Sequence, residues 1–152
     1  MSKRIVAGIV KEGHQVASGH ACDERFPNGT LAMQIPAFAK VGVDLSPFHR
    51  GTLNVSIAPH SFKVAKAWKT LPNIKWSPVM PAENFSFYRC GIRAIGNTAF
   101  IGGLVYWPHP STKPEFHQDS SILEILAPYL DGVKYGSRVE LELNSEGIAV
   151  IG

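Results

Sequence analysis

Glycine and proline interrupt this chain every few residues, and this limits the folds open to it. The sequence contains fourteen glycines and eleven prolines. Such spacing leaves little room for long helices but suits short strands that are joined by turns. The sequence therefore predicts a mainly β domain with one or two short helices.

Size and composition predict a single domain over residues 1–152. Hydrophobic residues make up 45% of the chain and aromatic residues 10%, which is enough to bury one sizeable core. The net charge is +3, but only 18% of the residues are charged, and the basic ones are scattered. This charge slightly favours a small anionic ligand and gives no indication of a nucleic acid partner.

The cytoplasm is the expected location. The chain contains two cysteines, Cys22 and Cys90, and its first residues lack the pattern of a secretory signal. No apolar run approaches the roughly 18 residues that are needed to cross a bilayer. Cys22 lies near His20 and Asp23 and could act as a nucleophile, but an ordinary thiol is the simpler interpretation because adjacent loop residues rarely face one another.

Patterns of apolar residues predict about seven short strands. The clearest signal is a hairpin of residues 85–95 and 98–106, joined by Gly96 and Asn97, a pair that tolerates the positive φ of a tight turn. Further extended segments are expected at residues 3–11, 30–35, 50–57, 138–143 and 148–151, and residues 122–127 are an apolar run that ends before Pro128.

Two segments between these strands differ in character. Residues 36–46 place apolar side chains at spacings of three and four, which predicts a short helix that ends before Pro47. Residues 58–84 carry Trp68 and Trp76 and are rich in proline and lysine, as is typical of a long irregular surface loop. Because no strand–helix–strand unit repeats, a small barrel is favoured over a layered α/β sheet.

The segment RGTLNVSI, residues 50–57, raises a question about its polar face. Thr52, Asn54 and Ser56 alternate with apolar residues, so they share one face of a strand. Small polar side chains are common on solvated sheet faces, and a wet face is one interpretation. The other is that Thr52 and Asn54 bind a hard cation such as Mg²⁺ together with phosphate oxygens.

The same segment resembles a known family. Gly51-Thr52-Leu53-Asn54-Val55, preceded by Pro47-Phe48, is similar to the motif of the archaeal CTP-dependent riboflavin kinases. The resemblance extends over most of the chain and includes residues 16–19, 34–47, 107–108, 123–128 and 136–143.

The resemblance implies a fold and an activity. The fold would be a six-stranded cradle-loop barrel with short helical additions. The activity would be transfer of the γ-phosphate of CTP to the 5′-hydroxyl of riboflavin, which yields FMN and CDP. The implied roles are Thr52 and Asn54 as Mg²⁺ ligands, Ser18, Gly19 and His20 as nucleotide-binding residues, and Glu124 and His117 as flavin-binding residues.

Two other functions stay open at the level of the sequence. Ser18 and Gly19 are followed by His20-Ala21-Cys22-Asp23 instead of further glycines, which favours a non-catalytic barrel that binds a flavin, a nucleotide or another anionic metabolite. The tryptophans of residues 58–84 suggest a protein-interaction or nucleic acid module as a third possibility.

Overall fold

The computed structural model describes residues 3–11, 30–49, 52–110 and 120–152, and this part of the chain is mainly β. It contains one helix, α1, and nine strands, more than the sequence predicts. The elements are β1 (Lys3–Lys11), α1 (Thr30–Ala39), β2 (Leu53–Ser56), β3 (Ser61–Val64), β4 (Lys69–Ile74), β5 (Glu83–Ala94), β6 (Ile101–Pro108), β7 (Ile122–Leu126), β8 (Arg138–Asn144) and β9 (Ile148–Ile151).

Six of the strands close into an antiparallel barrel. The order β5-β6-β7-β2-β1-β8 returns to β5, because β8 pairs with both β1 and β5. The predicted small barrel is thereby confirmed. So is the β5–β6 hairpin, in which Gly96 takes a φ of 96° at the turn, a conformation that favours glycine.

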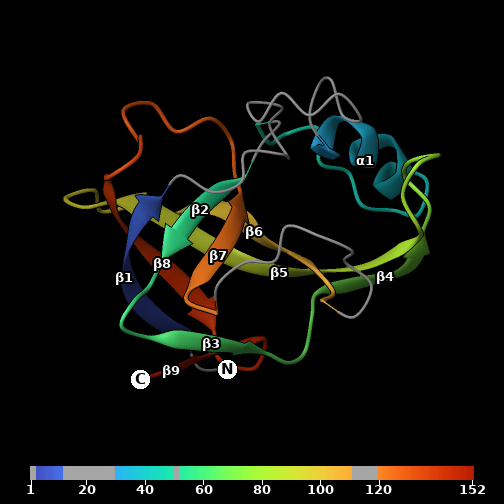
Figure 1. The fold of residues 1–152 in the computed structure, drawn as a ribbon. Helices are drawn as coiled ribbons and strands as arrows, with labels where there is room; N and C mark the ends of the chain where they lie inside the picture. The colour runs from blue at the N-terminus through green and yellow to red at the C-terminus, as the bar shows by residue number, and fades with distance from the viewer. Residues whose placement is uncertain (1–2, 12–29, 50–51, 111–119) are drawn as a thin grey trace.

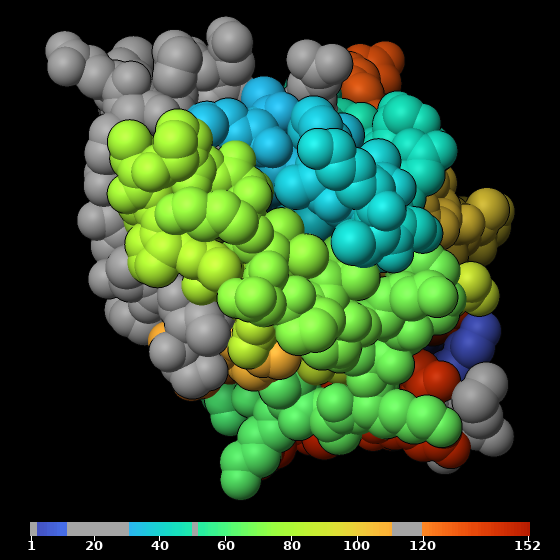
Figure 2. Space-filling model, turned by 90° about the vertical axis from the view of Figure 1, so that its right-hand side faces the viewer, coloured from blue at the N-terminus to red at the C-terminus, as the bar shows by residue number. Residues whose placement is uncertain are grey.

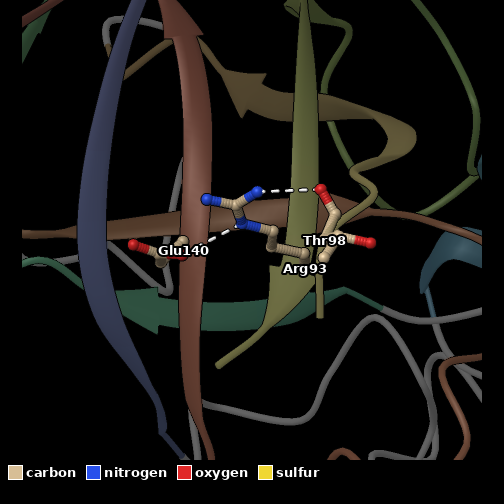
Figure 3. Close-up of polar contacts among 3 residues, drawn as sticks. All are labelled: Arg93, Thr98 and Glu140. Atoms are coloured by element: carbon tan, nitrogen blue, oxygen red, sulfur yellow. Dashed lines mark hydrogen bonds and ion pairs between the residues drawn. The ribbon is translucent and has the colours of Figure 1, made fainter. Parts of the chain in front are cut away.

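An ion pair holds the seam where β8 meets β5. Arg93 and Glu140 are directly opposite each other, and the Arg93 Nε donates to Glu140 Oε1 at 3.0 Å (Figure 3). Arg93 also donates through Nη1 to the carbonyl oxygen of Thr98 at 3.0 Å and lies over the Phe100 ring at 4.0 Å. The same side chain therefore ties the closing strand pair to the hairpin turn.

Strand β5 extends beyond the barrel and carries a second layer. Its last residues, Cys90–Ala94, pair with β8, whereas residues 83–87 pair with β4 along the same edge. Figure 1 shows β5 running from the barrel toward β4 and the helix. On that side of the molecule the helix lies directly against the green segment that contains β4 (Figure 2).

The domain accordingly has two hydrophobic cores. One fills the barrel and includes Val10, Val55 and Ile125. The other lies between the outer face of the barrel and α1, where Phe38 contacts the rings of Phe85 and Phe87 edge-on at 4.9 and 5.3 Å. Alternation along β6 assigns side chains to both cores: Val105 to the inner one, and Leu104 and Tyr106 to the outer one.

The helix differs from the sequence prediction. Residues 30–35 are the first turns of α1 and not an extended segment, and α1 ends at Ala39 instead of continuing to residue 46. Leu31, Gln34 and Phe38 are buried at helical spacings of three and four, so burial of this stripe outweighs the helix-interrupting tendency of Pro36. The chain then turns at Gly42, whose φ is 96°.

The prediction of an irregular surface loop over residues 58–84 is also wrong. This segment forms β3, which pairs with β9, and β4, which pairs with β5. Trp76 is buried in the outer core and donates through Nε1 to Glu83 Oε2 at 2.8 Å, whereas Trp68 is 39% exposed. In this segment β4 supplies one side of the second core.

Candidate functional site

A row of polar side chains crosses the outer face of the barrel wall. Asn54 on β2 is directly opposite Glu124 on β7. Leu104 and Val105 on β6 pair with Leu126 and Ile125 on β7, and the same register places Tyr106 opposite Glu124. Directly paired residues of antiparallel strands point to the same side of the sheet. Tyr106, Glu124 and Asn54 are therefore neighbours on three adjacent strands.

Thr52 joins this row from the chain just before β2. Its Oγ1 donates a hydrogen bond to Glu124 Oε1 at 3.2 Å. Thr52 and Glu124 are half-buried, so the contact is sheltered without being closed off from a ligand. This hydrogen bond brings together two residues that are 72 positions apart in the sequence.

The polar face of β2 is less exposed than an ordinary wet sheet face. Asn54 is only 8% exposed, and Thr52 and Ser56 are half-buried. The wet-face interpretation is wrong for Asn54. Because β2 lies between β1 and β7 in the closed wall, its side chains have neighbours on both sides.

Tyr106 links the row to the helix. Its hydroxyl donates to Gln34 Oε1 of α1 at 2.5 Å, and both side chains are buried. Burial raises the pKa of Tyr106 well above its ordinary value, and the negative charges of Glu124 and Glu83 raise it further, against a smaller lowering by the Gln34 hydrogen bond. Tyr106 is therefore a neutral hydrogen-bonding group beside the Glu124 carboxylate.

The side-chain oxygen atoms of this row are of the kind that a hard cation prefers. Within the described residues, no cluster of three or more His, Cys, Asp or Glu side chains could hold a metal ion. However, Mg²⁺ prefers oxygen ligands and takes much of its shell from water and phosphate. The Thr52 hydroxyl, the Asn54 amide oxygen and the Glu124 carboxylate supply such oxygens from two neighbouring strands.

The structure brings together three of the residues that the sequence resemblance assigns, namely Thr52, Asn54 and Glu124. Ser18, Gly19 and His20, assigned to the nucleotide, and His117, assigned to the flavin, lie outside the described residues. Cys22 and Asp23 do as well. Cys90 lies in β5, where burial raises the pKa of its thiol to about 12, which disfavours a reactive thiolate.

Sequence reasoning missed Tyr106 and Gln34. Tyr106 lies within the confirmed hairpin, but only the β6–β7 register places it opposite Glu124. Gln34 lies in a segment that was expected to be extended, which hid its place on the buried stripe of a helix. A helical pattern of Leu31, Gln34 and Phe38 was the signal that could have found it.

Comparisons with known proteins do not assign the chain to a family. No protein-family model matches the sequence, and a search of curated proteins finds no match. Among the described residues, no helix combines the length and apolar character needed to cross a membrane.

Proposed function

We propose that this protein is a CTP-dependent riboflavin kinase, which transfers the γ-phosphate of CTP to the 5′-hydroxyl of riboflavin. The observation that carries the proposal is the hydrogen bond from Thr52 to Glu124, with Asn54 directly opposite Glu124. It joins the residues of the Gly-Thr-Leu-Asn-Val motif to the Leu-Glu-Ile-Leu-Ala-Pro segment in one sheltered row. Both segments carry the resemblance to the riboflavin kinases.

Thr52 and Asn54 would hold Mg²⁺ in this site. When bound, the ion neutralises charge on the phosphate oxygens, which is a main requirement of phosphoryl transfer. The Thr52 hydroxyl donates a hydrogen bond to Glu124, so the lone pairs of Oγ1 are left to face a cation. A carboxylate that accepts a hydrogen bond from a metal-binding side chain fixes the orientation of that side chain.

Glu124 has a second role in the proposal. The hydroxyl of riboflavin loses its proton when it attacks the γ-phosphate, and the bond from that phosphate to the CDP oxygen breaks. Glu124 lies at the centre of the row, between Tyr106 and Asn54, where it would accept this proton. Since phosphoryl transfer depends mostly on alignment and charge stabilisation, a site without a P-loop is sufficient.

The direct test is formation of FMN. Purified protein is incubated with riboflavin, Mg²⁺ and one of CTP, ATP, GTP or UTP, and flavins are separated by chromatography. We expect FMN with CTP and much less with the other nucleotides. Absence of FMN with all four would overturn the proposal, and quenching of riboflavin fluorescence in the same samples would then favour a flavin-binding barrel without transfer activity.

A further inference from the structure

The polar row continues onto a fourth strand and ends at a positive charge. Lys11, the last residue of β1, is directly opposite Asn54 on β2. It is exposed, whereas its neighbour Val10 is buried in the barrel core opposite Val55. Lys11 therefore points to the outer face, on the same side as Asn54 and Glu124.

Register fixes how close Lys11 is to the proposed metal site. Directly paired residues of antiparallel strands have Cβ atoms about 4.5–5.5 Å apart, and a lysine side chain extends further than that from its backbone. The backbone at this end of β1 is held in place, because Gly136 N donates to Val10 O at 2.7 Å and Val10 N donates to Ser137 O at 2.9 Å. The ammonium group can reach a ligand that lies over Asn54.

Charge indicates what that ligand is. A nucleoside triphosphate with one Mg²⁺ keeps a net negative charge, and Glu124 adds another negative charge to the site. Of the four strand positions in the row, Tyr106, Glu124, Asn54 and Lys11, only Lys11 is positive. A lysine ammonium is a compact point charge that suits phosphate oxygens.

We propose that Lys11 binds the phosphate chain of the donor nucleotide beside the cation held by Thr52 and Asn54. This inference rests on the proposed function. It extends that function by naming a residue that distinguishes a nucleotide from its uncharged nucleoside. Sequence alone did not indicate Lys11, because its place beside Asn54 depends on the β1–β2 register.

The same strand offers a matched control. Lys3 lies on the same face of β1 as Lys11, at its other end, and it pairs with Glu142 of β8 at a distance of 3.5 Å. Both lysines are exposed, so replacing either has little effect on the folded state. Only Lys11 adjoins the polar row.

The test compares dissociation constants measured by calorimetry with Mg²⁺ present and riboflavin absent. Wild-type protein, Lys11→Ala, Lys11→Arg and Lys3→Ala are titrated with CTP and with cytidine. Because charged hydrogen bonds contribute more than neutral ones, we expect Lys11→Ala to weaken CTP binding by roughly tenfold or more. Cytidine binding should not change, Lys11→Arg should retain most of the CTP affinity, and Lys3→Ala should match the wild type.

Equal CTP affinity of Lys11→Ala and wild type would overturn the assignment. So would equal losses for CTP and cytidine, because these would indicate a structural effect. If the wild type binds none of the four nucleoside triphosphates, the Lys11 assignment fails together with the kinase proposal. If it binds one of them but forms no FMN, only the kinase proposal fails, and the titrations of that nucleotide and its nucleoside still decide the role of Lys11.

Discussion

Gln34 on the helix and Tyr106 on the barrel wall share a 2.5 Å hydrogen bond, and it is buried between the two layers of the domain. The β6–β7 register places Tyr106 directly opposite Glu124 on the neighbouring strand, on the same face of the sheet. One of the contacts that attach α1 to the barrel is thus one strand away from the Thr52–Glu124 pair. Packing of the second layer and geometry of the site are connected through Tyr106.

Removing this hydrogen bond should destabilise the protein. Tyr106→Phe leaves the buried Gln34 oxygen without its donor, at a cost of about 1–3 kcal/mol in the free energy of unfolding. In Gln34→Leu plus Tyr106→Phe neither polar group remains buried, so we expect the double variant to lose less than the sum of the single losses. Urea unfolding of the wild type, the two single variants and the double variant measures the coupling between Gln34 and Tyr106, and additive losses would contradict it.

Asn54→Ala should abolish FMN formation and also lower stability. Because Asn54 is only 8% exposed, its loss should cost about 1–2 kcal/mol in the free energy of unfolding. Ser56→Ala is the matched control on the same face of β2, two residues away, and should retain activity. Chromatography of flavins and urea unfolding give the two readouts, and FMN formation by Asn54→Ala would exclude Asn54 as a metal ligand.

Glu124→Gln keeps the shape of the side chain but removes its charge. If Glu124 accepts the hydroxyl proton, kcat should fall by about 10²–10⁴-fold while the KM for riboflavin changes little. Glu142→Gln, on the outer face of β8, serves as the control and should have no effect on kcat. A raised KM for riboflavin with unchanged kcat would instead indicate that Glu124 only binds the flavin.

His109 predicts a pH dependence of stability. Burial lowers the pKa of His109 below its ordinary value of 6.5, and its Nε2 lies 2.6 Å from the Oγ of the buried Ser86. The unfolded chain takes up a proton on His109 at a higher pH than the folded protein does. The contribution of His109 to the free energy of unfolding is therefore fully present above pH 6.5, and it is lost as the pH drops from there through the lowered pKa.

His109→Gln should remove this component. Urea unfolding of wild type and variant is compared between about pH 5 and pH 7.5, the range in which histidine changes its charge. The wild type should lose more stability than the variant on acidification. Parallel curves would show that His109 does not contribute to the pH dependence.

The sequence predicts the barrel well because strand periodicity is a local property. β1 and β8 show clear alternation, and the β5–β6 hairpin is marked by Gly96 and Asn97. The helix was predicted at residues 36–46, whereas α1 spans Thr30–Ala39, and the reason for this difference is tertiary. Residues 30–35 are apolar enough for either a strand or a helix. Packing of Leu31 and Phe38 in the outer core favours the helix.

The candidate site depends on information that a single sequence does not contain. The resemblance supplied Thr52, Asn54 and Glu124, and the structure places them together. The places of Tyr106 and Lys11 beside them follow from strand register, which is set by pairing between segments far apart in the chain. No local pattern around either residue specifies its partner.

The shared edge of β5 has a consequence for cooperativity. One half of the strand pairs with β8 in the barrel wall, and the other half pairs with β4 in the helix-bearing layer. Separation of either layer would expose a strand that the other layer needs. The two cores should therefore open together in a single global event, with the amide protons in the middle of β5 among the slowest to exchange with solvent.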